Sequence, residues 1–292
     1  MKTTPVQKQV GEFLDYLKNV KKRRAATIEH YRFYLNRFLN WAKLETIDSL
    51  SQQKITNYRP YLSQQKFYRC KKLKSTTQNY YLIALRSFLR YLRRNGLINI
   101  ATEKIKLTKP PKRIIPQISQ NDLNNLLAAP EQTNHQEIIK LRDRTLLELL
   151  LNGLRISEIA KLKKPDINLK NLLIITAKRK INLTHSARHW LNYYLAARTD
   201  NAPYLFICHD RAQNRREAKN GNNPLTPRSI QRIVKAYGQK ANLNVKITPQ
   251  KFRYYYAANQ IKQGADAKTL HQMLGHQSLA TTKIYLKENN SI

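Results

Sequence analysis

The chain has 292 residues, of which 54 are Lys or Arg and 18 are Asp or Glu, so its formal net charge of +36 indicates a polyanionic partner. The 41% of hydrophobic and 9% of aromatic residues exclude a disordered basic tail. The seven glycines are too far apart for a dinucleotide-binding or ATP-binding loop, and the two cysteines, Cys70 and Cys208, offer neither a disulfide framework nor zinc-ligand spacing.

The amino-terminal residues lead into no apolar segment of the signal-peptide kind. No run of the sequence approaches ~18 apolar residues, the length that a membrane-spanning helix needs. We therefore expect a soluble intracellular protein without a membrane partner.

The first third of the chain predicts four amphipathic helices, because apolar residues recur on one face at helical spacing. The first helix follows Thr4-Pro5, and a shorter third helix starts at Ser51. The fourth has Ser75 as its cap, carries leucines from 82 to 92, and stops at Gly96. We expect a small helical bundle with a basic face.

The basic face follows from a stretch of one-signed charge. No acidic residue occurs between Asp48 and Glu103, whereas Lys and Arg are frequent there. The positive charges of such a surface repel one another unless phosphates neutralise them, which favours a polyanion as partner. The alternative is a basic surface that only maintains solubility. The side chains expected to contact the polyanion are Lys71, Lys72, Lys74, Arg86, Arg90, Arg93 and Arg94.

Residues 106–116 predict a basic linker, because three prolines interrupt regular structure and lysines keep the segment solvated. The linker divides the chain into a helical domain, 1–105, and a second domain, 117–292. The second domain is expected to be mainly α with a small β-sheet. Its predicted elements are a helix capped by Ser119, a long helix from about Glu137 to Asn152, strands at 172–175 and 181–183 around a basic turn, and helices near Ser186, Thr226, Thr248 and Asp266.

Basic side chains lie at several predicted helix ends. Thr248-Pro249 begins a helix whose first turn carries Gln250 and Arg253 on one face. The free N–H groups of that turn and the planar Arg fork suit a phosphate. A solvated arginine is the alternative for this segment taken alone.

Two further segments carry the same kind of chemistry. Gly153-Leu154-Arg155-Ile156-Ser157-Glu158 places Arg155 between a helix stop and a new helix that Ser157 would cap. Leu274-Gly275-His276 places a histidine just past a helix capped by Asp266, and Tyr285 follows nine positions later. Either the histidine or the tyrosine alone would more simply be structural.

Together, the segments GLRISE, TPQKFR and LGHQSLATTKIY, with the preceding helical domain, resemble the tyrosine recombinase (phage integrase) family and its Xer-type enzymes. The resemblance covers nearly the whole chain. It implies an amino-terminal core-binding (SAM-like) bundle and a carboxy-terminal catalytic domain. In those enzymes a tyrosine attacks a DNA phosphodiester and forms a 3′-phosphotyrosyl bond.

The resemblance assigns this role to Tyr285. It implies that Arg155 and Arg253 clamp the scissile phosphate, that His276 bonds a non-bridging oxygen, and that a basic residue of the β-hairpin protonates the leaving 5′-oxygen. Fixed cationic donors stabilise the charge of a five-coordinate transition state, and the covalent bond conserves the energy of the broken one. We therefore expect no cofactor and no metal.

The chain departs from the family pattern at two places. Gln250 occupies a position where the family usually has histidine, so acid–base assistance is expected to be weaker there, and Tyr254 replaces a second common histidine. The hairpin is shorter than usual; Lys178 is our choice for the general acid, with Lys180 as the alternative.

The resemblance implies a homotetramer, or a tetramer shared with a related recombinase, acting on paired sites in double-stranded DNA through a Holliday junction. The implied location is the nucleoid in a prokaryotic cytoplasm. The role is either resolution of chromosome or plasmid multimers or integration and excision of a mobile element. Two alternatives are DNA relaxation of the type IB topoisomerase kind and a non-catalytic DNA-binding protein with a decayed active site.

Overall fold

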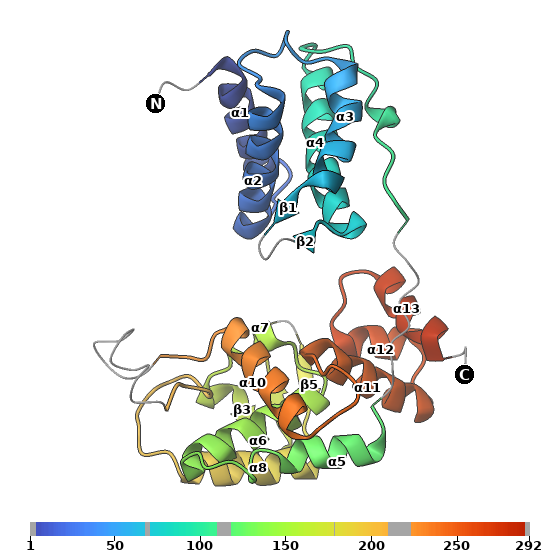
Figure 1. The fold of residues 1–292 in the computed structure, drawn as a ribbon. Coiled ribbons are helices and arrows are strands. Elements are labelled where there is room, and N and C mark those ends of the chain that lie inside the picture. The colour runs from blue at the N-terminus through green and yellow to red at the C-terminus, as the bar shows by residue number, and fades with distance from the viewer. Residues whose placement is uncertain (1–3, 68–70, 110–117, 178, 210–222, 290–292) are drawn as a thin grey trace. The chain divides into compact units, whose positions relative to one another are not determined.

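The computed structural model describes residues 4–67, 71–109, 118–177, 179–209 and 223–289. The chain divides into two compact units, Met1–Lys112 and Arg113–Ile292, and each is described by itself (Figure 1). None of the helices in these described ranges is both long enough and apolar enough to cross a membrane.

The first unit is the expected helical bundle. Its helices bury one apolar face each, and the ring centroid of Phe13 lies 5.4 Å from that of Phe88 and 5.3 Å from that of Tyr91. A short antiparallel hairpin, which the sequence did not predict, precedes the fourth helix. The elements are α1 (Pro5–Asn19), α2 (Ala25–Ala42), α3 (Gln52–Gln64), β1 (Lys66–Phe67), β2 (Lys71–Lys72), α4 (Ser75–Arg94) and a 3-10 turn, η2 (Thr102–Lys104).

Helix starts in this unit follow local side-chain chemistry. The Thr4 hydroxyl accepts from the backbone N–H of Gln7, while the Gln7 side chain accepts from the backbone N–H of Thr4, a reciprocal capping box. At the start of α3, the Ser51 hydroxyl accepts from the backbone N–H of Lys54, without a reciprocal bond. The prediction for α4 was wrong by one residue, because Lys74 is the cap residue, without a side-chain cap bond, and Ser75 is already helical.

The described part of the expected linker packs on this first unit. Arg59 donates to the carbonyl of Lys106 at 2.7 Å, and Asn79 bonds both the N–H and the carbonyl of Thr108. The prolines of the linker lie outside the described residues.

The second unit is mainly helical and surrounds a three-stranded antiparallel sheet in the order β3-β4-β5. Ile174 and Ile181 are opposite each other across β4 and β5, and both are buried. The elements are α5 (Gln120–Ala128), α6 (Glu137–Leu151), α7 (Ile156–Ile159), η3 (Lys164–Asp166), β3 (Ile167–Asn168), β4 (Leu173–Ile175), β5 (Lys180–Asn182), α8 (His185–Ala196), α10 (Pro227–Lys240), α11 (Pro249–Lys262), α12 (Ala267–Leu274) and α13 (Leu279–Asn289).

Helix α6 lies in the core of this unit, where it packs against α8, α7 and α11. It ends at a turn in which Gly153 has φ +76°, a conformation that favours glycine. A Cβ atom on Gly153 would lie 2.6 Å from the ring of Tyr256, so α11 also requires glycine there. The close approach of α11 to this turn brings two of the predicted functional segments together.

One predicted cap in this unit was wrong, and a second is confirmed in position but without its side-chain hydrogen bond. Arg155, not Ser157, is the cap residue of α7, because its backbone is extended and the Glu158 side chain accepts from its N–H at 2.7 Å. Thr248 has the extended backbone of a cap residue for α11, but its side chain makes no cap hydrogen bond. The caps at Ser119 and Asp266 are confirmed.

Candidate active site

The predicted catalytic side chains come from four segments of the second unit. Arg155 starts α7, Gln250 and Arg253 lie in the first turns of α11, and His276 follows α12. Tyr285 lies on α13, which packs against α11 and α12 (Figure 1). Hydrogen bonds among these segments bring all five residues into one site.

Arg155 joins the start of α7 to the turn after α12. Its Nη1 donates to Glu158 Oε1 at 3.2 Å, and its Nη2 donates to the carbonyl of Gly275 at 2.8 Å. The side chain is 30% exposed. A guanidinium has five N–H groups, and the bonds to the described residues use two of those of Arg155.

Arg253 is the second arginine, and it is buried. Its Nη1 donates to the carbonyl of Gly153 at 2.8 Å, and its Nη2 donates to the carbonyl of Leu274. Burial first, and then the charges of Arg155 and Arg179, lower the pKa of Arg253 to about 10, so the guanidinium stays charged at neutral pH. A buried charge is destabilised unless it is paired, so an anion placed between Arg155 and Arg253 would stabilise the charged guanidinium.

A third arginine, Arg179, completes the cluster, and sequence reasoning missed it. It lies in the turn between β4 and β5, and only 5% of its side chain is exposed. It donates to both oxygens of Glu158, at 3.3 and 2.8 Å, and to the carbonyls of Gly153, at 2.9 Å, and Met273. Arg179 therefore links the hairpin to both loops that carry the other functional residues.

Glu158, the last residue of the GLRISE segment, had no role predicted from the sequence, and in the structure it pairs with Arg155 and Arg179. Burial alone would raise the pKa of its carboxyl, but hydrogen bonds and charge from Arg179 and the N–H of Arg155 outweigh burial and lower it. The ionised carboxylate fixes two of the three arginines. Its spacing of three from the cap residue is the one signal that could have identified it.

His276 lies beside the arginines and is held by α13. Its Nδ1 is 2.9 Å from the hydroxyl oxygen of Thr282, a fully buried residue. Burial, followed by the charges of Arg253 and Arg155, lowers the pKa of His276 to about 4. The imidazole is therefore neutral at physiological pH.

Tyr285 is 3% exposed and packs with Ala257, Leu270 and Leu274. Its hydroxyl oxygen accepts from Gln250 Nε2 at 2.9 Å. The Tyr254 ring lies 4.5 Å from the Tyr285 ring, centroid to centroid, and the His276 ring lies 5.3 Å from it. The tyrosine is thus fixed in the site by polar and aromatic contacts from the same chain.

The residue chosen as general acid, Lys178, lies outside the described residues. The alternative, Lys180, is the exposed first residue of β5 and pairs with Ile175. It lines a cavity of about 210 Å³ with Tyr256 and Gln260, and neither Arg155 nor Arg253 lines that cavity.

The basic side chains predicted to contact DNA lie at both ends of α4. Lys72 and Lys74 precede it, whereas Arg90, Arg93 and Arg94 are in its last turns. A helix of 20 residues is about 30 Å long, so the two groups are roughly that far apart. Of the remaining residues, Arg86 is half-buried on the same helix, and Lys71 is in β2.

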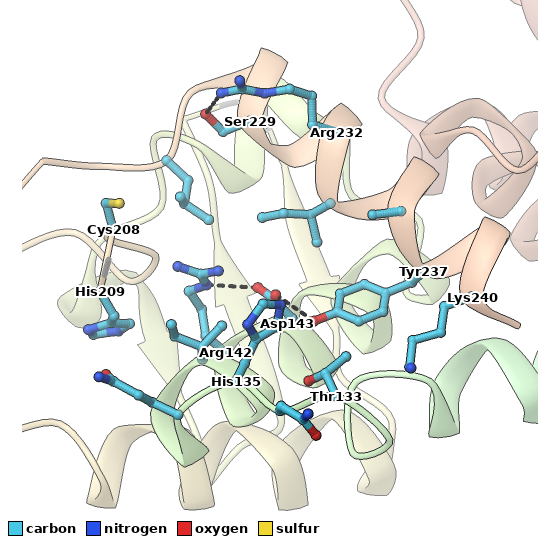
Figure 2. A pocket seen from close by; sticks show the side chains of 16 residues that line it. Thr133, His135, Arg142, Asp143, Cys208, His209, Ser229, Arg232, Tyr237 and Lys240 are labelled. Atoms are coloured by element: carbon cyan, nitrogen blue, oxygen red, sulfur yellow. Dashed lines mark hydrogen bonds and ion pairs between the residues drawn. The ribbon is translucent and has the colours of Figure 1, made fainter. Parts of the chain in front are cut away.

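A larger cavity, of about 670 Å³, lies between α10 and the start of α6 (Figure 2). In its wall Asp143 accepts from Arg142 Nε at 2.7 Å and from the Tyr237 hydroxyl at 2.8 Å. Among the residues that the structure describes, Arg155, Gln250, Arg253, His276 and Tyr285 do not line this cavity. The motifs therefore form the arginine cluster and not this cavity.

Residues 116–291 match the phage integrase family, and residues 10–96 match its N-terminal SAM-like domain. The chain is 29% identical over 287 residues to tyrosine recombinase XerA of Pyrococcus horikoshii, covering 94% of this chain and 87% of XerA. It is 31% identical over 300 residues to tyrosine recombinase XerC of Chlamydia caviae, and this match covers 94% of this chain and 92% of XerC.

Among solved structures, XerH bound to a palindromic difH substrate superposes with a TM-score of 0.71 at 18% identity, over 99% of this chain and 88% of that one. This likeness shows the fold: a SAM-like helical unit followed by an integrase catalytic unit, as the sequence predicted. The family match covers more than half of the chain and agrees with the order of the three motifs. The chain belongs to the phage integrase family and is a site-specific tyrosine recombinase, an enzyme that cleaves DNA and exchanges its strands.

Proposed function

We propose that Tyr285 is the nucleophile and that Arg155, Arg253 and His276 hold the scissile phosphate. The O–P bond to Tyr285 forms as the bond from phosphorus to the 5′-oxygen breaks. The tyrosine proton passes to solvent water, and the 5′-oxygen gains a proton from Lys178. The product is a 3′-phosphotyrosyl link and a free 5′-hydroxyl. In the reverse reaction, the 5′-hydroxyl of a second DNA strand attacks the phosphotyrosyl phosphorus and releases Tyr285.

The observation that supports this proposal most is the hydrogen bond between Gln250 and the Tyr285 hydroxyl at 2.9 Å. Gln250 lies one helical turn before Arg253, so the bond fixes the hydroxyl near a buried guanidinium. Arg155 and Arg253 each use two of their five N–H groups on protein oxygens within the described chain. The remaining N–H groups suit the non-bridging oxygens of a phosphodiester.

The test is covalent trapping. The bound DNA site is first mapped by footprinting, and a nicked suicide duplex carrying that site is then incubated with the protein. The expected result is a covalent protein–DNA adduct with wild type and none with Tyr285→Phe. An adduct formed by Tyr285→Phe would assign the nucleophile elsewhere, and absence of any adduct on the mapped site would leave a DNA-binding protein with a decayed active site.

We also infer a homotetramer acting on paired duplex sites. Support comes from XerH, whose solved complex contains its difH substrate, and from the basic side chains of the first unit. A plasmid carrying two mapped sites distinguishes the outcomes. Resolution into two circles is expected, whereas relaxation of supercoils alone would indicate activity of the topoisomerase kind.

The biological role that we propose is Xer-like resolution of chromosome or plasmid multimers, by similarity to the XerA and XerC relatives. Deletion of the gene is expected to cause accumulation of multimers of a replicon that carries the mapped site. Integration or excision of a mobile element is the other outcome, and sequencing of the junctions would identify it.

A further inference from the structure

Two histidines share one buried hydroxyl beside the site. Thr282, on α13, is fully buried. Its Oγ1 lies 2.9 Å from Nδ1 of His276 and 3.3 Å from Nδ1 of His271, in the last turn of α12. The two rings are 6.5 Å apart and inclined at 67°. Neither Thr282 nor His271 has a role in the function proposed above.

The shared hydroxyl restricts the protons that the two rings can carry. A threonine hydroxyl has a single proton, so it can donate to only one of the two Nδ1 atoms. A neutral imidazole has one N–H and one bare nitrogen. With both rings neutral, either one Nδ1 donates to Thr282 while the other accepts from it, or both Nδ1 atoms carry a proton and donate to the two lone pairs of the hydroxyl oxygen. Only the arrangement in which the hydroxyl donates to His276 leaves Nδ1 of His276 bare.

The direction decides what His276 can offer a phosphate. His276 is neutral because burial and the facing groups Arg253, Arg155, His271 and Arg179 hold its pKa at about 4. Phosphate oxygens only accept hydrogen bonds, so the ring must present N–H at Nε2. In a neutral ring this requires a bare Nδ1 that accepts from Thr282. The opposite direction would turn a lone pair toward the phosphate.

We propose that His271 and Thr282 are positioning residues that hold His276 as its Nε2–H tautomer. The Nδ1–H of His271 donates to Thr282 Oγ1, and the Thr282 hydroxyl donates to Nδ1 of His276. Each bond polarises the next, so the chain strengthens the outward Nε2–H donor. This proposal depends on the phosphate-binding role proposed for His276.

The direct test is nitrogen NMR of the DNA-free protein, full length, with ¹⁵N-labelled histidine at pH 7. Signals are assigned with His271→Gln and His276→Gln. The expected spectrum has a bare Nδ1 and a protonated Nε2 for His276, with a protonated Nδ1 for His271. A protonated Nδ1 on His276 would overturn the proposal. The readout is independent of DNA cleavage, so it does not fail if the role of His276 fails.

The kinetic test uses Thr282→Val, which keeps the shape but removes both bonds. Single-turnover cleavage at saturating DNA is expected to fall about 10- to 100-fold, with DNA affinity unchanged. Thr282→Ser is expected to restore the rate, and Thr281→Val, at the exposed neighbouring threonine, is the matched control. A full rate in folded Thr282→Val would contradict the proposal, as would a matching loss in Thr282→Ser.

The role of His271 is tested by two variants, one that keeps a hydrogen-bond donor at this position and one that keeps a side chain of similar bulk without a donor. His271→Gln keeps an N–H that can reach Thr282 and is expected to cleave within about 2-fold of wild type. His271→Leu removes the donor and is expected to cleave several-fold more slowly. Equal rates for the two variants would mean that a hydrogen bond from His271 to Thr282 does not contribute to cleavage. If His276→Ala cleaves like wild type, the phosphate-binding role fails while the NMR result still stands.

Discussion

Gln250 donates a hydrogen bond from its side-chain Nε2 to the hydroxyl of Tyr285 at 2.9 Å. The two residues are 35 positions apart and belong to α11 and α13. An amide N–H can stabilise a developing phenolate, but it cannot take up the proton of the hydroxyl. The residue that departs from the family pattern therefore contacts the proposed nucleophile directly.

This contact predicts the effects of two substitutions at position 250. Gln250→Ala removes one hydrogen bond and is expected to slow adduct formation about 10-fold, the equivalent of roughly 1.4 kcal/mol. Gln250→His adds a group that can accept a proton and is expected to cleave faster than wild type. Single-turnover rates on a suicide duplex measure both effects. If Gln250→His cleaves no faster, the position only orients the hydroxyl.

The buried Arg179–Glu158 pair predicts a large loss of stability. Arg179→Met leaves the Glu158 carboxylate buried without its main partner and is expected to cost about 3–5 kcal/mol. The control is Arg93→Met, since Arg93 and Glu103 form a solvent-exposed pair whose loss should lower the free energy of unfolding far less. Denaturant unfolding of both variants measures the difference. Equal, small losses would mean that Arg179 is dispensable for the site.

The general acid is identified by changing the leaving group. A 5′-bridging sulfur leaves without protonation, so a substrate that carries it is expected to restore cleavage by a variant that lacks the general acid. We expect this rescue for Lys178→Ala, and we expect Lys180→Ala to cleave the ordinary substrate nearly normally. Rescue of Lys180→Ala instead would assign the role to Lys180.

The charges on α4 predict the salt dependence of DNA binding. Loss of one phosphate contact lowers the slope of log K against log salt by about 1. We expect this change for Arg90→Ala and for Arg94→Ala, with similar effects on cognate and unrelated duplexes. Lys18→Ala, on α1, should leave the slope unchanged. A change in sequence preference with an unaltered slope would indicate base contacts instead.

The depressed pKa values of two histidines predict a loss of stability in acid. Burial lowers the pKa of His209 to about 4, as it does for His276, and Arg142 and Arg198 add to the effect. Between about pH 6.5 and 4 the unfolded chain binds protons that the folded chain does not, so the free energy of unfolding falls as pH falls. His209→Gln should make this dependence shallower. An unchanged dependence in denaturant titrations would contradict the assignment.

The sequence by itself determined the elements whose causes are local. Helix periodicity, the cap at Asp266 and the motifs around Arg155, Arg253, His276 and Tyr285 depend on residues within a few positions of each other, and these predictions agree with the helices observed. Ser157 shows the limit of such local patterns. Its residue type favours the cap position, but the cap residue of α7 is Arg155, whose N–H donates to the Glu158 side chain.

The tertiary structure alone decided how the site is held together. Arg179, in a basic turn, has the sequence context of a solvated residue, yet contacts with Glu158, Gly153 and Met273 bury it. Likewise, only the packing of α12 and α13 brings His271 and His276 to one threonine hydroxyl. Burial of a charge or a polar group depends on partners that are distant in the chain. Local patterns specify which residue types are available, while contacts between distant elements decide how their side chains are oriented and buried.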